Sequence, residues 1–360
     1  MAPPRVLVLF NEPVLAADHP DADAEHDVIH SVNIVTGFLE KAGLPVTRLG
    51  VSTDPTPLVA RLKNDPPDVV FNLFEGTADH GNTEAFVAGI MEWLAVPFTG
   101  SPAQAMTLAR NKLLAKHLFI GAGIETPAFF AVEAGEACPA NTLGWPVIVK
   151  PAREDASVGI DQGAVVTTDA DLRDRVEYIL ARYGGPVLVE QFIVGREMHV
   201  TLVELDAAAP APTALPFSEI LFQKGEDDHT DLWPIYSYDA KWRTDSSEYH
   251  RTPVDVPVVL PEDVTGRLVR AAQKTYRLLG CRDYARVDAR VTDEGKVYIL
   301  EANPNPSITS IMLRYGLEAI GWTHDAFVAH VAKYAAARGS DWTVPRAPVT
   351  PLPSAQAVGA

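Results

Sequence analysis

A stretch near the C-terminal end of the chain, residues 284–303, carries two acidic residues whose spacing suggests metal chemistry. The stretch reads as two short strands around a turn at residues 294–295. This register places Asp288 opposite Glu301. Because like charges directly opposite each other destabilise a sheet, we expect a cation to lie beside the two acids.

The register also predicts which residues surround the acidic pair, because side chains alternate between the two faces of a strand. One face is predicted to carry Arg286, Asp288, Arg290, Ile299, Glu301 and Asn303, with Arg286 opposite Asn303. The other is predicted to be a core face with Val287, Ala289, Val291, Tyr298, Leu300 and Ala302. Two carboxylates and an amide oxygen are ligands that Mg²⁺ prefers. The alternative is a solvated face on which the two arginines neutralise the acids.

Two lysines are predicted at positions that are unfavourable for a positive charge, one at the end of a buried strand and one at the start of a helix. Lys150 ends a predicted apolar strand, and burying its ammonium group is costly unless it meets an anion. The loop that follows contains Ser157 and Gly159, whose backbone N–H groups could bind phosphate oxygens. Lys112 begins a predicted helix, where the helix dipole disfavours a cation. Lys150 is therefore a candidate for binding phosphate, although a strand-end lysine often simply extends to solvent. The position of Lys112 suggests a role other than stabilising its helix.

Two glutamates flank the short segment that follows a predicted strand at residues 187–191. Glu190 could accept a hydrogen bond from an amine, while nearby backbone groups could bind the edge of a purine. Glu197 could bind ribose hydroxyl groups. The alternative for both is an exposed acid beside a turn at Gly195.

The elements that must position these residues follow two patterns. Apolar strands alternate with amphipathic helices in the first hundred residues, which predicts an open parallel sheet covered by helices. Four strands are expected there, at residues 5–10, 45–49, 68–73 and 96–99. The rest of the chain mixes strands and helices in an α+β pattern. We expect four segments, namely an N-terminal domain, a central subdomain, a C-terminal subdomain with the metal site, and a flexible tail, at residues 1–100, 101–189, 190–340 and 341–360.

Composition limits the function classes. The formal net charge of −17 over 360 residues argues against a nucleic acid or an anionic membrane surface as partner. Cys138 and Cys281 lack CxxC spacing, which favours a reducing compartment, and no apolar run reaches membrane-spanning length. The sequence predicts a cytoplasmic protein. Three histidines lack metal-binding spacing and are expected to be structural or solvent-exposed: His80, His199 and His229.

Read together, these segments resemble the ATP-grasp superfamily and, within it, the D-alanine–D-alanine ligase family. The resemblance extends from about Arg5 to Trp322 and rests on VPFTGSPAQAMTLARNK, WPVIVKPAREDASVGI, VLVEQFIVGRE, SYDAKW, and CRDYARVDAR with YILEANPNPSITS. It implies an ATP-grasp fold of α/β and α+β type with an N-terminal parallel-sheet, Rossmann-like domain. It also implies ATP-dependent joining of a carboxylate to an amine through an acyl phosphate, with release of ADP.

The resemblance assigns a role to each matching residue. The implied ATP-binding residues are Lys112, Lys150, Ser157, Glu190, Gln191, Ile193 and Glu197. The implied ligands of two Mg²⁺ ions, for which Mn²⁺ could substitute, are Asp288, Glu301 and Asn303. The implied catalytic residues are Arg286, Ser157 and Lys241, and the implied substrate contacts are Glu25, Trp242 and Ser307. Amino acids or small peptides are the implied substrates, and a homodimer is the implied assembly.

The chain departs from the family pattern mainly where substrate is expected to bind. Asp155 and Ala156 stand where the family has glycine and serine, and Trp242 stands in place of a tyrosine. Ser307 replaces a glycine, and Met312 replaces a serine that helps to bind the second substrate. An alternative is therefore the same chemistry on another amino acid or small peptide in a natural-product pathway. A third interpretation is a nucleotide-binding protein without catalytic activity.

Overall fold

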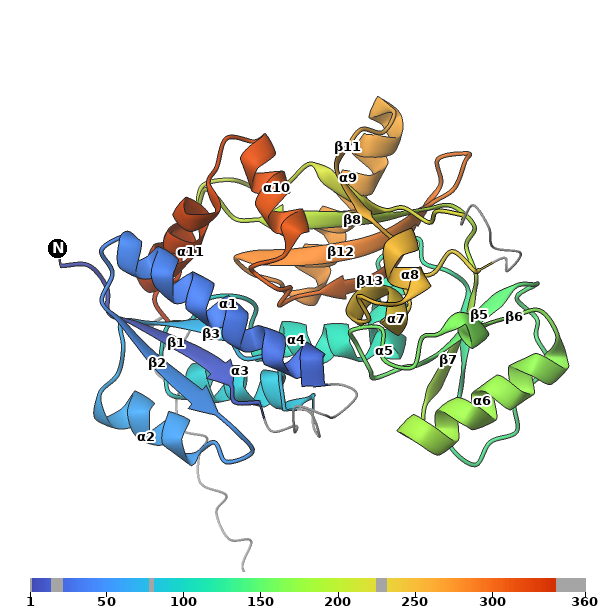
Figure 1. The fold of residues 1–360 in the computed structure, drawn as a ribbon, viewed down its shortest axis with the longest axis horizontal. Coiled ribbons are helices and arrows are strands. Elements are labelled where there is room, and N and C mark those ends of the chain that lie inside the picture. Colours follow the sequence, from blue (N-terminus) through green and yellow to red (C-terminus); the bar gives the residue numbers. More distant parts are fainter. Residues whose placement is uncertain (1, 14–21, 78–80, 225–231, 341–360) are drawn as a thin grey trace, which may run out of the picture.

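The computed structural model describes residues 2–13, 22–77, 81–224 and 232–340, so the expected flexible tail lies outside the described residues. Three sheets make up the molecule. The N-terminal sheet lies at one end, a small sheet lies at the other, and the largest sheet lies between them (Figure 1). Within the described residues, no helix is both long and apolar enough to cross a membrane.

The N-terminal sheet has the strand order β2 (Val46–Val51), β1 (Val6–Asn11), β3 (Val69–Leu73), and all of its strands are parallel. The prediction of a fourth strand at residues 96–99 is wrong, since this segment forms only a single bridge between Val70 and Phe98. The chain contains Pro97 here, which has no N–H to extend a ladder of hydrogen bonds.

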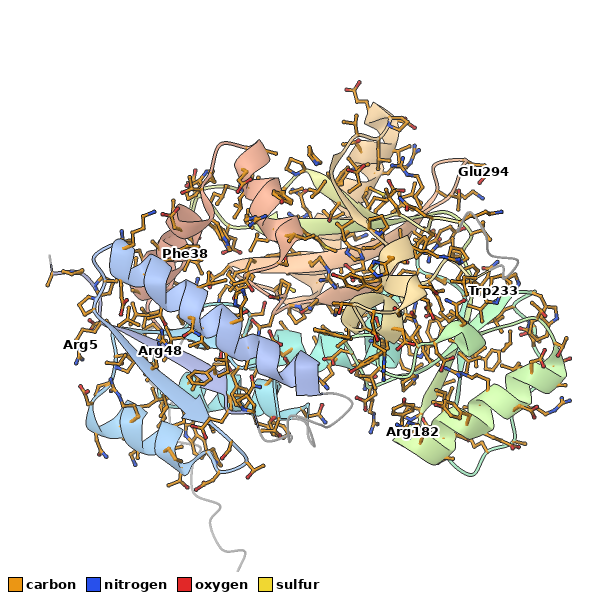
Figure 2. The ribbon with its side chains drawn as sticks, viewed as in Figure 1. Arg5, Phe38, Arg48, Arg182, Trp233 and Glu294 are labelled. Carbon is orange, nitrogen blue, oxygen red and sulfur yellow. The ribbon has the colours of Figure 1, made fainter. Side chains whose placement is uncertain are left out.

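Helices cover both faces of the N-terminal sheet. Val6 and Val8 face a core formed with α1 (Ala22–Lys41), α10 (Ile311–Ala319) and α11 (His324–Arg338). Leu7 and Leu9 point the other way, toward α2 (Thr56–Asn64), α3 (Thr83–Trp93) and α4 (Ala103–Arg110). Phe38 on α1 meets the ring of His324 at 5.1 Å between centroids (Figure 2). The last helices of the chain therefore complete the core of its first strands.

The small sheet has the order β4 (Phe129–Val132), β7 (Val187–Gln191), β5 (Val147–Pro151), β6 (Val165–Val166), with antiparallel pairs throughout. Helix α6 (Asp169–Tyr183) covers one face and contributes Leu172, Val176 and Ile179 to the core. The hydroxyl group of Thr168 caps α6 by accepting a hydrogen bond from the Asp171 N–H at 3.2 Å. Helix α5 (Lys112–Gly121) precedes this sheet, and the Asn111 side chain caps its start by accepting a hydrogen bond from the Leu114 N–H at 3.1 Å.

The largest sheet has the order β11 (Val254–Val258), β10 (Phe217–Ile220), β8 (Arg196–Val203), β12 (Tyr284–Val291), β13 (Val297–Asn303), and β9 (Thr213–Ala214) also pairs with β8. Helix α9 (Glu262–Leu279) packs on its apolar face and buries Leu268, Ala272 and Leu279 against Met198 and Val200. Two short helices, α7 (Tyr238–Trp242) and α8 (Ser247–Arg251), lie between β10 and β11 in the chain, and the 3₁₀ helix η1 (Gln162–Ala164) precedes β6.

The hairpin of β12 and β13 has the predicted pairs at its functional end. Asp288 lies opposite Glu301, and Arg286 lies opposite Asn303. A β-bulge shifts the register beyond Asp288, so that Ala289 pairs with Ile299. The predicted face of Ile299 is wrong for this reason, because the bulge turns its side chain into the apolar core.

Candidate active site

Charged side chains gather on the face of the largest sheet opposite α9. On β8, Glu197 and His199 alternate with the core residues Met198 and Val200. In the neighbouring strand β12, Asp288 pairs with His199, and Arg290 pairs with Glu197. Asp288 is only 6% exposed and Glu197 only 8%. Of the hairpin acids, Asp288 is neutralised by Arg286, whereas Glu301, whose side chain is 35% exposed, contacts Lys112, and Arg290 contacts Glu197 instead. The alternative of a solvated face is therefore wrong for the buried Asp288.

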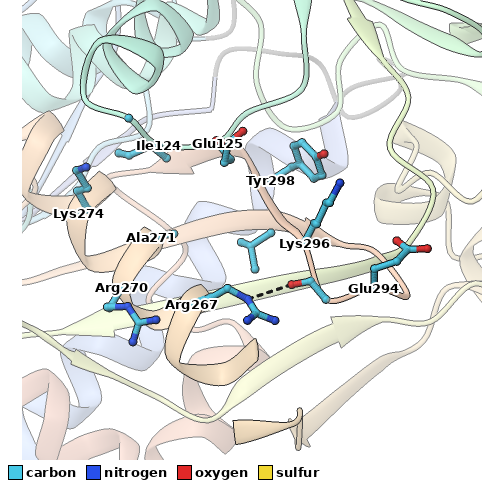
Figure 3. A pocket seen from close by; sticks show the side chains of 12 residues that line it. Ile124, Glu125, Arg267, Arg270, Ala271, Lys274, Glu294, Lys296 and Tyr298 are labelled. Atoms are coloured by element: carbon cyan, nitrogen blue, oxygen red, sulfur yellow. Dashed lines mark hydrogen bonds between the residues drawn. The ribbon is translucent and has the colours of Figure 1, made fainter. Parts of the chain in front are cut away.

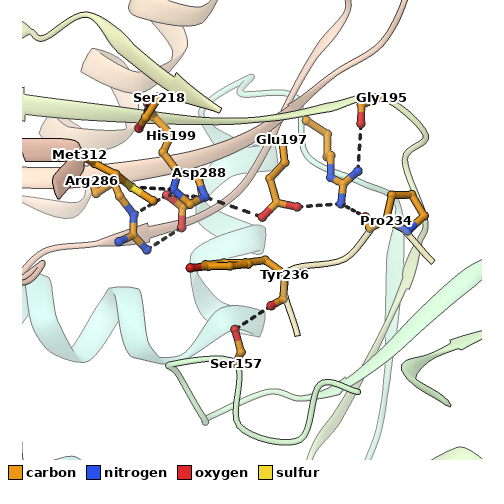
Figure 4. Close-up of polar contacts among 11 residues, drawn as sticks. Ser157, Gly195, Glu197, His199, Ser218, Pro234, Tyr236, Arg286, Asp288 and Met312 are labelled. Carbon is orange, nitrogen blue, oxygen red and sulfur yellow. Dashed lines mark hydrogen bonds and ion pairs between the residues drawn. The ribbon is translucent and has the colours of Figure 1, made fainter. Parts of the chain in front are cut away.

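Each acid on this face contacts its own arginine. The Arg286 guanidinium donates to both oxygens of Asp288, from Nε at 2.7 Å and from Nη2 at 2.9 Å (Figure 4). Burial raises the pKa of the Asp288 carboxyl, but the charge and hydrogen bonds of Arg286, together with His199, outweigh burial, and the pKa lies below its usual value. Arg290 Nη2 donates to Glu197 at 2.7 Å, and Nη1 donates to the Gly195 carbonyl at 3.0 Å. Both acids are therefore held ionised.

His199 lies between these acids, and sequence reasoning missed its position. Its Nε2 atom is 3.7 Å from Glu197 and 3.8 Å from Asp288, while Nδ1 is 3.2 Å from the sulfur of Met312 (Figure 4). His199 was predicted to be either structural or solvent-exposed. It is buried, so the solvent-exposed alternative is wrong. Its spacing of two from Glu197 on a strand was the signal that could have placed it on this face.

Lys112, the first residue of α5, joins the hairpin to the loop after β5. Its Nζ lies 2.9 Å from Glu301 and donates to the Glu154 carbonyl at 2.7 Å. Burial raises the pKa of the Glu301 carboxyl, but Lys112 and Lys150 outweigh burial and lower the pKa to about 2. A lysine at a helix start, unfavourable for the dipole, is thus compensated by a carboxylate.

The donor set predicted for a metal fits a hard cation. Asp288 and Glu301 lie side by side on adjacent strands, and Asn303 adds an amide oxygen that accepts a hydrogen bond from the Asn305 N–H at 3.0 Å. In the described part of the chain, no group of three or more His, Cys, Asp and Glu side chains is arranged to hold a metal. The set consists of two carboxylates and an amide, and cationic side chains neutralise both carboxylates.

Glu190, at the end of β7, is 1% exposed and lies between two ammonium groups. Lys150 contacts its Oε2 atom, and Lys116 contacts Oε1. Neither oxygen has a hydrogen bond of regular geometry with the described residues, so both atoms are paired by charge alone. The seven side chains Lys112, Lys116, Lys150, Glu190, Arg286, Asp288 and Glu301 are called the charge network below.

The loop at residues 153–159, called the phosphate loop below, meets the segment that leads into α7. Ala156 and Ser157 have φ angles of 51° and 65°, a strained conformation for residues other than glycine. The Ser157 hydroxyl donates to the Tyr236 carbonyl at 2.9 Å (Figure 4). The Trp242 indole N–H donates to the Ala156 carbonyl at 3.1 Å. The loop thus connects the small sheet to the largest one.

An ion pair holds the phosphate loop to α4. Arg110 Nη1 lies 2.7 Å from Asp155 and 3.6 Å from Glu84 on α3. Gly81 makes room for this arginine, because a Cβ atom there would lie 1.7 Å from Nη2. Burial raises the pKa of Glu84 to about 8, and the charge of Asp155 contributes to the rise.

Lys241 on α7 is half-buried and has no carboxylate partner within the described residues. Burial lowers the pKa of its ammonium group, and the charge of Arg286 lowers it further. The Lys241 Nζ atom lies over the ring of Trp242, 4.9 Å from the ring centroid. Such a cation is suited to an incoming anion.

The remaining predicted residues are more scattered. Glu25 lies in α1, but its side chain is outside the described part. Ser307 Oγ is 3.1 Å from the hydroxyl of Thr309, which is 2.8 Å from that of Ser31 on α1. The side chain of Ile193 is buried. Gln191 is exposed, and its N–H donates to the Ala128 carbonyl at 2.8 Å.

A surface cavity of about 720 Å³ lies away from these residues, beside α9 at the turn end of the hairpin (Figure 3). Four basic side chains line it: Arg267, Arg270, Lys274 and Lys296. Arg267 Nε donates to the Gly295 carbonyl at 3.2 Å. None of the predicted site residues lines this cavity.

Comparisons with known proteins agree with this geometry. The family profile described as "D-ala D-ala ligase C-terminus" matches residues 118–333. The D-alanine–D-alanine ligase of Geobacter sulfurreducens is 33% identical over 248 residues, covering 68% of this chain and 70% of that protein. That of Desulforudis audaxviator is 30% identical over 322 residues, covering 88% of this chain and 96% of that protein.

A solved structure extends the similarity to the fold. The D-alanine–D-alanine ligase from Bacillus anthracis, complexed with ATP, superposes with a TM-score of 0.71 at 21% identity. The match covers 93% of this chain and 98% of that one. This similarity confirms the predicted ATP-grasp fold with its N-terminal parallel sheet.

Proposed function

Since the chain belongs to the D-alanine–D-alanine ligase family, we propose that it joins the carboxylate of one D-alanine to the amine of a second. The enzyme is an ADP-forming, ATP-dependent ligase that forms a C–N bond. The observation that carries this proposal is the pair Asp288 and Glu301, which lie side by side and are each contacted by a cation. The relatives do not favour the alternative of a different amino acid or peptide.

The metal ligands in this proposal are Asp288, Glu301 and Asn303. Mg²⁺ held there, as two ions, would neutralise the charge of the phosphates and polarise the phosphoryl group that is transferred. Arg286 and Lys112 now neutralise the two carboxylates. These two cations become available for phosphate and substrate when a metal takes over that role.

We assign the nucleotide to the side of the site formed by β5, β7 and β8. Lys112 and Lys150 are assigned as the cations for the phosphates. Lys112 begins α5, Lys150 lies near the end of β5, and the charges of both act on Glu301 of the hairpin. Glu190, with the backbone at Gln191 and Ile193, is assigned to the adenine. Glu197 is assigned to the ribose, and its burial supports a role in binding a neutral hydroxyl group.

The reaction needs positioning and charge stabilisation more than a covalent enzyme group. The first D-alanine carboxylate attacks the γ-phosphate and gives an acyl phosphate and ADP. The second D-alanine amine attacks the acyl carbon and expels phosphate. Arg286 is placed to stabilise the oxyanion of this second step, while Lys241 and Ser157 hold the phosphoryl group. Glu25, Trp242 and Ser307 are the proposed substrate contacts.

The test is a phosphate-release assay on the purified protein with ATP and Mg²⁺. D-Alanine is expected to give ADP, phosphate and one D-alanyl-D-alanine per ATP, identified by mass spectrometry. L-Alanine is the matched control and should give no dipeptide. Formation of AMP and pyrophosphate would rule out the acyl-phosphate route, and absence of the D-alanine dipeptide would rule out the proposed substrate.

The domain boundaries and the assembly are also part of the proposal. The proposed division is at residues 1–100, 101–189 and 190–340; the three sheets support it in outline, but the boundary after residue 189 falls within β7, and α10 and α11 pack on the N-terminal sheet. Phe86 and Trp93 lie seven residues apart on one side of α3 and are both exposed, which supports a homodimer. The other proposed partners are the small-molecule substrates. The free thiols Cys138 and Cys281 support a cytoplasmic location. Light scattering of Trp93→Glu against wild type tests the dimer.

A further inference from the structure

Lys116 is a buried cation with no role in the proposed reaction. It follows Lys112 by one turn of α5, so the two side chains leave the same side of the helix. Lys112 contacts Glu301 of the hairpin, whereas Lys116 contacts Glu190 of the small sheet. The Lys116 side chain is 1% exposed, so its charge is fully removed from solvent.

The position of Lys116 is fixed by more than its ion pair. Its Nζ donates to the Thr126 hydroxyl at 2.7 Å, and that hydroxyl donates to the Ile299 carbonyl on β13 at 2.8 Å. The Phe129 ring centroid is 5.6 Å from Nζ. Lys116 is thereby tethered beside Glu190 from several directions.

Lys150 is placed differently. Glu190 and Glu301 stabilise the charges of both lysines, but Glu197 on β8 acts on Lys150 as well, so Lys150 lies within the field of the acids on the largest sheet as well as of Glu190. It lies one residue before the end of β5, which leads into the phosphate loop. Lys150 is therefore the one of the two lysines that can leave Glu190 for a phosphate near the hairpin.

That movement would change the charge balance around Glu190. Two cations now face one buried carboxylate, and the departure of Lys150 leaves one cation and one carboxylate. Without Lys116, the departure would leave a buried carboxylate with no counter-charge, which takes up a proton rather than remain ionised. A protonated Glu190 loses much of its capacity to accept a hydrogen bond from an amine.

We propose that Lys116 is a positioning residue for the nucleobase: it keeps Glu190 ionised while Lys150 binds phosphate, and so maintains selection for a purine with an exocyclic amine. The inference rests on the assignment of Glu190 to the adenine in the proposed function. Lys116 on α5 and Lys150 on β5 face Glu190, while Glu301 on β13 and Glu197 on β8 act on it through the lysines. The two unsatisfied oxygens of Glu190 agree with this role.

The experiment compares equilibrium binding of ATP and of purine riboside triphosphate, which lacks the 6-amino group, between pH 6.5 and 9. No amino acid is present, so ligase activity does not enter. In wild type, ATP should bind more tightly. In Lys116→Met, ATP binding should weaken about tenfold, weaken further as the pH falls, and lose its advantage over the analogue. Lys116→Arg should restore the preference, and the exposed Lys333→Met should match wild type.

Kinetics give a second readout. At saturating ATP, the kcat of Lys116→Met should stay within a few-fold of wild type while KM for ATP rises. A preference for ATP that survives in Lys116→Met, with no pH dependence, would overturn the inference. If Lys116→Met does not fold, Lys116→Met/Glu190→Leu removes both charges and should bind ATP and the analogue equally. A retained preference in that variant would overturn it too.

The outcome is separable from that of the proposed function. A wild-type protein that makes no D-alanine dipeptide contradicts the proposed function, yet the binding comparison still tests Lys116. A wild-type protein that binds ATP and the analogue equally overturns the assignment of Glu190, and the role of Lys116 with it, while leaving ligase activity intact.

Discussion

The charge network and the phosphate loop hold their side chains in different ways. In the network, Glu190 lies between two lysines, and Asp288 is held by two guanidinium nitrogens of Arg286. In the phosphate loop, Asp155 is 54% exposed in its ion pair with Arg110, and four hydrogen bonds between side chains and backbone carbonyls hold the loop. The network is paired through charged side chains, whereas the loop is held mainly through backbone carbonyls.

The energies of the two regions differ accordingly. Removing one partner of a buried pair leaves an uncompensated charge and costs about 3–5 kcal/mol. An exposed pair contributes only about 0.2–1 kcal/mol. The network can therefore give up a cation only when another positive charge takes its place. An exposed ion pair and hydrogen bonds to backbone carbonyls, such as those of the loop, carry no such requirement.

The largest effect is expected from the metal ligands of the network. Asp288→Asn or Glu301→Gln should lower kcat by about 10³-fold, equivalent to about 4 kcal/mol of transition-state stabilisation, because each removes a negative ligand from the metal. The measurement is D-alanine-dependent phosphate release at saturating Mg²⁺. Asp293→Asn, an exposed change in the turn of the same hairpin, is the control and should behave as wild type. Near-normal turnover in both ligand variants would contradict the metal assignment.

Lys241 sharpens the comparison, because it is a half-buried cation outside any ion pair of the described residues. Lys241→Met should lower kcat/KM for ATP about 10²-fold through loss of a phosphate contact. Its melting temperature should stay level or rise, because a desolvated charge is removed. Lys296→Met, at an exposed position, should change neither quantity. A large loss of stability in Lys241→Met would show that this cation has a structural partner instead.

A smaller effect is expected in the phosphate loop. Asp155→Asn should lower kcat/KM about threefold, because the loop loses its ion pair with Arg110. Asp263 is the control: its side chain is 67% exposed and pairs with Arg267 at 2.9 Å on α9, away from the phosphate loop. Asp263→Asn should cost similar stability in chemical denaturation but leave turnover unchanged. Equal effects of both variants on turnover would remove the loop contact from the mechanism.

The last effect concerns stability instead of turnover, and it is a pH dependence. Burial and Asp155 raise the pKa of Glu84 from 4.5 in the unfolded chain to about 8 in the folded protein. Between these values the folded state binds more protons, so stability falls as pH rises, by up to about 1.4 kcal/mol per pH unit. Glu84→Gln should flatten this slope in urea titrations from pH 5 to 8, whereas the exposed Glu40→Gln should preserve it. An unchanged slope in Glu84→Gln would assign the dependence to other groups.

Residues on regular elements could be predicted from the sequence, because the period of a strand or helix fixes their direction. The opposition of Asp288 and Glu301 was predicted in this way and is confirmed. The same reasoning predicts that His199, two residues after Glu197, lies on the same face of its strand. It also predicts that Lys116, four residues after Lys112, lies on the same side of its helix.

Contacts between distant segments could not be predicted in the same way. The pair of Arg110 and Asp155 joins α4 to a loop 45 residues later, and it depends on the space left by Gly81. No local period encodes such a contact. The pairing of Lys116 with Glu190 likewise depends on how α5 packs beside β7, which only the tertiary structure determines.

The bulge in the β12–β13 hairpin has a consequence for how this enzyme tolerates insertions. The pairs near the turn follow one register and the pair of Asp288 with Glu301 follows another. Leu300, which has no partner of its own on β12, is the extra residue between the two registers. The turn at residues 292–296 lies beyond the last pair, Val291 with Val297, so a change in its length leaves the pairing at Asp288 unaltered. Deletion of Leu300 would remove the extra residue of the bulge and leave Glu301 opposite Asp288 and Ile299 opposite Ala289 in one regular register. The hairpin separates a variable turn end from the end that holds the proposed metal ligands, and libraries of turn variants should retain those ligands.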